Sequence, residues 1–210
     1  MPEPPRSIHS ECLKIDVKAP GLTTSAYLLS DRIRALFQTC QFFDVHLRVG
    51  NARFPAHQAV LAAMSDWLRL NLKSLLEEEE GSDQLPQIRL ERISNPDAVM
   101  ILLDAAYELG GEGPIPHAAL ADVLRLSHMF QLRRLEEQAV QSLAMEITGE
   151  NVLERLDICV EFNLTFLYER ILTHLHEQGL LLEVCKCPEM CCYPQLMQHM
   201  VMYLSTHDLK

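Results

Sequence analysis

Four cysteines close to residue 190 are the side chains whose type and spacing could most readily do chemistry. They stand as Cys185-x-Cys187-x-x-x-Cys191-Cys192, and clustered thiolates are ligands that zinc prefers. Structural zinc sites, however, use paired cysteine knuckles separated by a longer loop, so this compact spacing fits them poorly. We therefore expect thiols that flank helices in a reducing compartment, with no bound metal and no cofactor. An enzyme that uses these thiols is the alternative.

Two other segments could suggest catalysis or phosphate binding. His57 follows Pro55-Ala56 at the start of a predicted helix, and no nucleophile or acid stands at a recognisable spacing from it. A buried, hydrogen-bonded histidine is therefore favoured over a general base. The segment 110–113 lacks the Gly-Lys-Ser/Thr ending of a phosphate loop, and Glu112 would repel phosphate. The sequence thus predicts no catalytic residue and a protein that is not an enzyme.

The first predicted element of the chain is an amphipathic helix. Leu29, Ile33, Leu36 and Phe37 are spaced i, i+4, i+7 and i+8, which places them along one helix face. Ser30-Asp31 supplies capping chemistry near the predicted start of this helix. The resulting stripe of apolar side chains belongs either to the core or to an interface.

A β-hairpin is predicted next. Residues 43–49 alternate between apolar and polar, Gly50-Asn51 forms a two-residue connection, and residues 52–54 return as the second strand. Pro55 closes that strand and opens a helix, where its missing N–H costs little.

The remaining pattern is mostly helical. Residues 87–90 predict one more strand, and Ser94-Asn95-Pro96-Asp97 is a helix-start signature with a polar cap, a proline and an acid. After the glycine-rich break at 110–114, the predicted helices cover 118–130, 132–146, 151–161, 164–177 and 194–205. The predicted fold class is α+β, with a short β-sheet flanked by helices, followed by an all-α region.

Composition limits the partners that this chain could bind. The formal net charge is -11, and the densest basic element is Arg133-Arg134, so we expect no nucleic-acid partner. No stretch approaches the roughly 20 apolar residues that span a bilayer, and the charge disfavours anionic lipid, so we expect no membrane partner. Residues 1–10 contain three prolines and Glu3 without an apolar core, which does not fit a secretory signal. We expect an intracellular protein of the cytoplasm, the nucleus or both.

The predicted hairpin and the helix after it resemble the signature of the BTB/POZ family. The matching residues are Asp44-Val45-x-Leu47-x-Val49 and Phe54-x-Ala56-His57-x-Ala59-Val60-Leu61-Ala62-Ala63-x-Ser65. Ile88-x-Leu90 looks like the family's third strand, and residues 102–107 look like the helix that follows it. The resemblance implies a BTB/POZ fold that binds other proteins.

The segment after residue 146 resembles a BACK region, which implies an all-α BACK-like helical region. Asn151-Val152-Leu153 looks like its entry, with the Asn151 side chain capping the first helix. Pro194-x-Leu196 is similar to the end of the shortened BACK region in the speckle-type POZ protein group. The resemblance implies a flexible lead-in over residues 1–27, a BTB/POZ domain over 28–146 and a partial BACK-like region over 147–210.

The resemblance also implies a homodimer. In BTB homodimers the first helix packs across the two-fold axis and the next helix faces it. By resemblance the dimer contacts are Leu29, Ile33, Leu36 and Val60. The alternative from the residues alone is that this stripe folds onto the chain's own domain.

A cullin-binding element is implied by the same resemblance. Cullin-binding relatives place a hydrophobic-x-Glu element before the third strand, and Leu76-x-Glu78 falls there, with Leu75-x-Glu77 as the register alternative. An apolar anchor beside a carboxylate suits a partner surface, although a solvated acid run has the same composition.

The expected function is that of a homodimeric adaptor that recruits an unknown protein substrate to a cullin-3-type E3 ubiquitin ligase. The alternative is a BTB dimerisation scaffold, transcriptional or structural, that does not bind a cullin.

Overall fold

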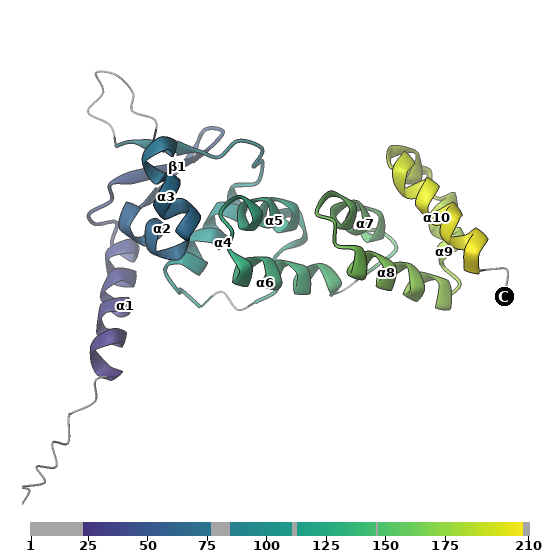
Figure 1. Ribbon diagram of the computed structural model, residues 1–210, viewed down its shortest axis with the longest axis horizontal. Helices are drawn as coiled ribbons and strands as arrows, with labels where there is room; N and C mark the ends of the chain where they lie inside the picture. Colours follow the sequence, from purple (N-terminus) through teal and green to yellow (C-terminus); the bar gives the residue numbers. More distant parts are fainter. Residues whose placement is uncertain (1–22, 77–84, 111–112, 146, 208–210) are drawn as a thin grey trace, which may run out of the picture.

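The structure is a computed structural model that describes residues 23–76, 85–110, 113–145 and 147–207. A small sheet and its surrounding helices form one end of an elongated molecule, and helices alone form the other end (Figure 1). The fold is α+β followed by helices, as predicted. The elements in chain order are α1 (Thr23–Gln38), β1 (Val45–Val49), β2 (Ala52–Ala56), α2 (Gln58–Met64), α3 (Asp66–Leu75), β3 (Gln87–Arg89), α4 (Pro96–Ala106), η1 (His117–Ala119), α5 (Leu120–Met129), α6 (Arg133–Ala144), α7 (Val152–Glu161), α8 (Thr165–Glu177), α9 (Leu181–Lys186), η2 (Pro188–Cys192) and α10 (Pro194–His207).

The sheet has the strand order β2-β1-β3. β1 and β2 form the predicted antiparallel hairpin, with Val49 opposite Ala52, and β3 lies parallel to β1 with Ile88 opposite Leu47. Gly50 in the connection has φ +55°, a left-handed conformation that glycine adopts without strain. Burial alternates along β1, as predicted: Val45, Leu47 and Val49 are buried, and the residues between them are half-buried.

Pro55 was predicted to open the helix after the hairpin, but it lies inside β2 opposite His46. β2 is an outer strand of the sheet, where a missing N–H removes no bond to a neighbouring strand. The helix α2 begins three residues later, at Gln58.

The first helix also begins earlier than predicted, at Thr23. Ser30 and Asp31 therefore lie inside α1 and do not cap it; both accept hydrogen bonds from the Arg34 guanidinium, at 3.0 and 3.1 Å. Residues 23–27 of the predicted lead-in belong to this helix, and residues 1–22 lie outside the described residues.

The two predicted helix caps have different outcomes. The polar cap predicted within residues 94–97 is made by Asn95, whose side-chain oxygen accepts from the Asp97 N–H at 2.9 Å with Pro96 in the first turn. Asn151 occupies the cap position of α7 but makes no cap bond there. Its side-chain oxygen accepts instead from the Thr148 N–H at 2.8 Å, so the predicted Asn151 cap was wrong.

Helical pairs continue the chain away from the sheet. α5 with α6, α7 with α8, and α9 with α10 follow one another along the long axis of the molecule (Figure 1). Val152 and Leu156 of α7 are fully buried in the core, and Leu164 is half-buried. The short helix α9 was not predicted.

Candidate functional site

The predicted interface stripe lies on a helix that the rest of the domain covers only in part. Leu29 is 62% exposed, Leu36 is half-buried, and Ile33 packs partly against the core. α1 extends away from the sheet and the other helices (Figure 1). Val60 lies on α2 and is half-buried against the core.

The carboxyl-terminal half of α1 holds this helix to the domain. The Phe37 ring stacks on Tyr107 with centroids 4.1 Å apart, and it meets Phe43 edge-on at 6.2 Å. The Ser30 hydroxyl donates to the Glu108 carboxylate at 3.2 Å, and the Arg34 guanidinium lies 3.6 Å from it. The anchored half fixes the direction of α1 and leaves Leu29 largely exposed.

Phe42 is a further exposed apolar residue that the sequence analysis did not single out. Its side chain is 79% exposed, and its φ of +59° turns the chain between α1 and β1. The signal in the sequence is the adjacent pair Phe42-Phe43, of which Phe43 packs against the Phe37 ring.

The structure places only part of the predicted cullin-binding element. Leu76 is the C-cap of α3, where its N–H donates to the Leu72 carbonyl at 3.2 Å, and its side chain packs partly against the core. Glu78 lies outside the described residues, as does Glu77 of the alternative register. Leu70 on the same helix is 75% exposed and was not singled out by the sequence.

A groove of about 940 Å³ runs between α4, α6 and the 113–116 loop. Its lining combines apolar residues such as Ile115 and Leu135 with Arg34, Asp104 and Glu108. Burial raises the pKa of the Asp104 carboxyl.

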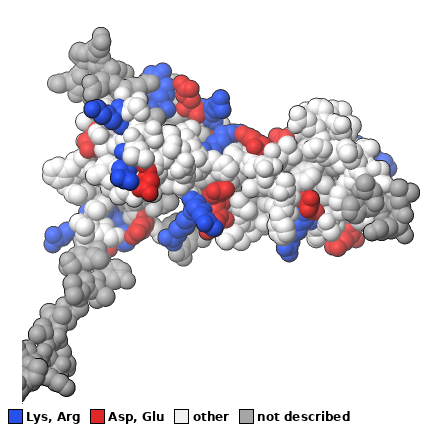
Figure 2. Space-filling view, viewed as in Figure 1, with Lys and Arg blue, Asp and Glu red and all other residues white. Residues whose placement is uncertain are grey.

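Charges of both signs are interspersed on the surface. On the face drawn in Figure 2, basic and acidic side chains lie among one another and form no broad basic patch. Arg133, from the densest basic element of the sequence, pairs with Glu137 at 3.0 Å. This face therefore does not resemble a surface for nucleic acid.

The cysteine cluster spans α9 and η2. Cys185 and Cys187 are half-buried, Cys191 and Cys192 are exposed, and Cys185 Sγ lies 3.7 Å from Met200 Sδ. Burial, with a smaller effect from Cys187, raises the pKa of the Cys185 thiol. Within the part of the chain that the structure describes, no three His, Cys, Asp or Glu side chains are grouped to hold a metal ion.

Two other cysteines differ in their surroundings. Cys159 is 1% exposed, and burial raises the pKa of its thiol to about 12. Cys40 is exposed, because the chain turns there with φ +55° after α1.

His57 has partners for both ring nitrogens. Nε2 lies 2.9 Å from the Gln41 carbonyl, which can only accept, so Nε2 carries the proton and Nδ1 accepts from the Tyr107 hydroxyl at 2.7 Å. The Tyr107 hydroxyl also accepts the His57 N–H at 2.9 Å, and burial raises the Tyr107 pKa to about 12. His57 is half-buried and joins three elements, in agreement with a structural role.

The family model described as "BTB/POZ domain" matches residues 33–147, which is more than half of the chain. Mouse Kelch-like protein 40 is 31% identical over 126 residues, 60% of this chain and 19% of that protein. Human BTB/POZ domain-containing protein 9 is 27% identical over 153 residues, 71% of this chain and 23% of its own length. Rat Kelch-like protein 21 is 29% identical over 144 residues, 66% of this chain and 23% of that protein.

Among solved structures, the BTB domain of zebrafish PATZ1 matches with a TM-score of 0.47 and 20% identity, covering 60% of this chain and 97% of that one. The chain spans no more than a quarter of the length of the relatives named above. None of the described helices has the length and apolar character needed to cross a membrane.

Proposed function

Because this chain belongs to the BTB/POZ family, we propose that it is a homodimeric adaptor that recruits a protein substrate to a cullin-3-type ubiquitin ligase. In this proposal ubiquitin transfer is catalysed by the recruited ligase, and the chain itself supplies binding surfaces. Such an adaptor works in the cytoplasm or the nucleus. The proposed parts are a BTB/POZ domain over residues 28–146 and a partial BACK-like region over 147–210.

The observation that carries the proposal is the apolar stripe on α1. Leu29 is largely exposed, and Ile33 and Leu36 lie on the same helix face. A two-fold axis next to α1 would pair this stripe with its own copy, as isologous dimers do, with Val60 of α2 completing the contact. Burial of these side chains would contribute roughly 25 cal/mol per Å² of apolar surface.

The proposed cullin contact is Leu76 with Glu78. Leu76 terminates α3, so the apolar side chain sits at the boundary of a rigid helix and the acidic segment that follows. An anchor on a rigid element loses little conformational entropy on binding. The exposed Leu70, on the same helix, would widen the apolar contact.

The test is the mass of the complex in solution, measured by light scattering for the chain alone and mixed with cullin-3. We expect twice the mass of one 24.0 kDa chain alone, and co-elution with cullin-3 when mixed. Leu76→Asp should abolish co-elution and leave the dimer intact. Leu182→Asp, at an exposed leucine of α9, is the matched control.

Each outcome decides between functions. Binding that survives Leu76→Asp would show that the contact lies elsewhere on the chain. A dimer that never co-elutes with cullin-3 would identify a dimerisation scaffold in place of a ligase adaptor.

A further inference from the structure

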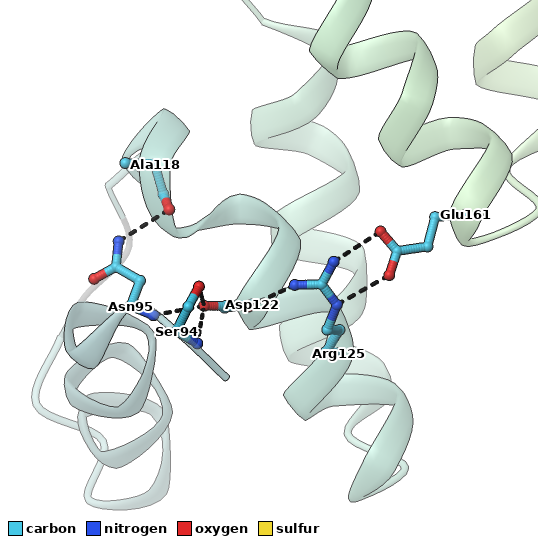
Figure 3. A network of polar contacts seen from close by, with 6 residues as sticks. All are labelled: Ser94, Asn95, Ala118, Asp122, Arg125 and Glu161. Carbon is cyan, nitrogen blue, oxygen red and sulfur yellow. Dashed lines mark hydrogen bonds and ion pairs between the residues drawn. The ribbon is translucent and has the colours of Figure 1, made fainter. Parts of the chain in front are cut away.

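A polar network joins the BTB/POZ part of the chain to the helices after it (Figure 3). Arg125 of α5 donates from Nε and Nη2 to the two carboxylate oxygens of Glu161 on α7, at 2.9 and 2.8 Å. Its Nη1 donates to Asp122 Oδ1 at 2.6 Å. We name Asp122, Arg125 and Glu161 the latch, because these three residues connect α5 to α7.

The second oxygen of Asp122 holds the loop before α4. Oδ2 accepts from the N–H groups of Ser94 and Asn95 at 2.8 and 2.7 Å and from the Ser94 hydroxyl at 3.0 Å. Burial alone would raise the Asp122 pKa, but these donors and Arg125 outweigh it and lower that pKa. One buried carboxylate therefore separates the Ser94 hydroxyl from the Arg125 guanidinium (Figure 3).

We propose that Ser94 is a phosphorylation site and that its phosphate opens the latch. Ser94 is exposed, and the exposed Arg92 two residues earlier offers a cation to a kinase with an acidic peptide groove. In the reaction the Ser94 oxygen attacks the terminal phosphorus of ATP. The new O–P bond forms as the bond to the bridging oxygen breaks, ADP leaves, and the hydroxyl proton passes to the kinase's base.

Phosphate at Ser94 changes the network in two ways. The hydroxyl no longer donates to Asp122, and a charge of about -2 arrives within hydrogen-bonding reach of that carboxylate. The phosphate oxygens also compete for Arg125, because guanidinium groups bind phosphate in the same two-pronged geometry as carboxylate. Arg125 is 30% exposed and so has room to turn away from Glu161.

The opened latch loosens α7 without detaching it. Arg155 of α7 is 4% exposed and donates to the Ser142, Leu143 and Met145 carbonyls at the end of α6. These contacts do not involve Ser94. The expected change is therefore a local increase in the opening of α7, about five- to tenfold, as for loss of one partly exposed charged pair.

The experiment uses the full chain with phosphoserine installed at position 94 by genetic encoding. Hydrogen exchange of α7 amides should accelerate about five- to tenfold, while β1 keeps its protection. The control is phosphoserine at position 74, an exposed serine on α3 whose hydroxyl donates to the Asn71 carbonyl at 2.8 Å. In parallel, the unmodified chain is incubated with an arginine-directed serine/threonine kinase and ATP, and the product is mapped by mass spectrometry.

Arg125→Gln separates the latch from a general effect of charge. This variant opens the latch by itself, so α7 should exchange faster and phosphate at Ser94 should add nothing further. The switch is overturned if phosphate at Ser94 leaves α7 unchanged, if phosphate at Ser74 has the same effect, or if the effect persists in Arg125→Gln. A kinase that modifies other serines and leaves Ser94 unmodified overturns the site.

Discussion

At the scale of single residues, His57 connects three elements through one hydroxyl and one carbonyl. Its ring bonds the Tyr107 hydroxyl at the end of α4 and the Gln41 carbonyl after α1. Its backbone N–H, at the N-cap of α2, donates to the same Tyr107 hydroxyl. Tyr107 is 2% exposed, so its hydroxyl has no ready replacement partner in water. The stability of the family's signature segment thus depends on the hydrogen bonds of one histidine.

His57→Ala should therefore lower the free energy of unfolding by about 1–3 kcal/mol, since a buried hydroxyl loses its acceptor. Urea unfolding of the variant measures this loss. Tyr107→Phe and the double variant complete a cycle in which the two losses should not add, because both remove the same bond. Additive losses would contradict the assigned pairing.

Cys159 predicts a specific dependence of stability on pH. Its thiol has an ordinary pKa of 9.0 that rises to about 12 in the folded chain. Below pH 9 the thiol is protonated in both states and contributes no pH dependence. Between pH 9 and 12 only the unfolded chain loses the proton, so stability falls by at most about 1.4 kcal/mol per pH unit.

Cys159→Ala should remove this part of the alkaline loss. Unfolding free energies of the unchanged chain and of Cys159→Ala are compared from pH 8 to pH 11. The difference isolates the Cys159 thiol from the tyrosines, which both proteins share. Parallel curves would show that Cys159 ionises normally in the folded chain. Exposed Cys191 should react with a maleimide in the native protein, while Cys159 should not.

Residue-level predictions from the sequence were correct where the local signal was complete. The segment Ser94-Asn95-Pro96-Asp97 predicted a polar cap with a proline and an acid, and in the structure Asn95 makes that cap. Asn151 is followed by an acid, Glu154, but by no proline, and its side-chain oxygen accepts from the Thr148 N–H instead. Cys40 lies between Phe37 and Phe42 in the sequence, but whether it is buried depends on a left-handed turn that no local pattern predicts.

At the scale of elements, the end of α6 depends on a side chain from α7. Arg155 donates to the Ser142, Leu143 and Met145 carbonyls, and the Ser142 carbonyl, at 3.2 Å, also accepts from the Met145 N–H. Arg155→Met keeps most of the volume and removes every donor. We expect a loss of about 3–5 kcal/mol in unfolding free energy, measured by thermal or urea unfolding.

Arg170→Met on α8 is the matched control for Arg155→Met. Arg170 is exposed, so its loss should change stability by less than about 0.5 kcal/mol. Equal effects of the two substitutions would mean that the buried guanidinium contributes no more than a surface one.

The periodicity of apolar residues and the capping residues predicted the hairpin and the long helices, but three features could not be predicted from local sequence. The parallel pairing of β3 with β1 joins Ile88 to Leu47, and no local pattern selects that neighbour. Pro55 is compatible with a strand only because β2 is an outer strand. α9 has six residues and no side-chain cap, so its pattern was too short to distinguish from a loop.

At the scale of the whole molecule, the candidate site could be predicted only as a set of residues. The spacing of Leu29, Ile33 and Leu36 predicted a helix face, and the structure has that helix. Whether the same chain covers this face depends on the direction of α1. That direction is set by contacts between residues far apart in the sequence. Phe37 on Tyr107 is such a contact, across 70 positions of sequence, and no local pattern contains it.

The exposure of Leu29 makes the proposed dimer testable without unfolding the monomer. A side chain that is 62% exposed contributes little to the stability of its own domain, so Leu29→Asp should leave the unfolding transition almost unchanged. In a two-fold dimer, however, the substitution brings two carboxylates together in an apolar contact. We expect the dissociation constant to rise at least a hundredfold, about 2.7 kcal/mol, as for a central interface residue. Analytical ultracentrifugation across a concentration series measures it, with Leu182→Asp as the control for adding charge elsewhere. A wild-type chain that sediments as a monomer at micromolar concentration, or a Leu29→Asp variant that dimerises normally, would place the function of α1 outside self-association.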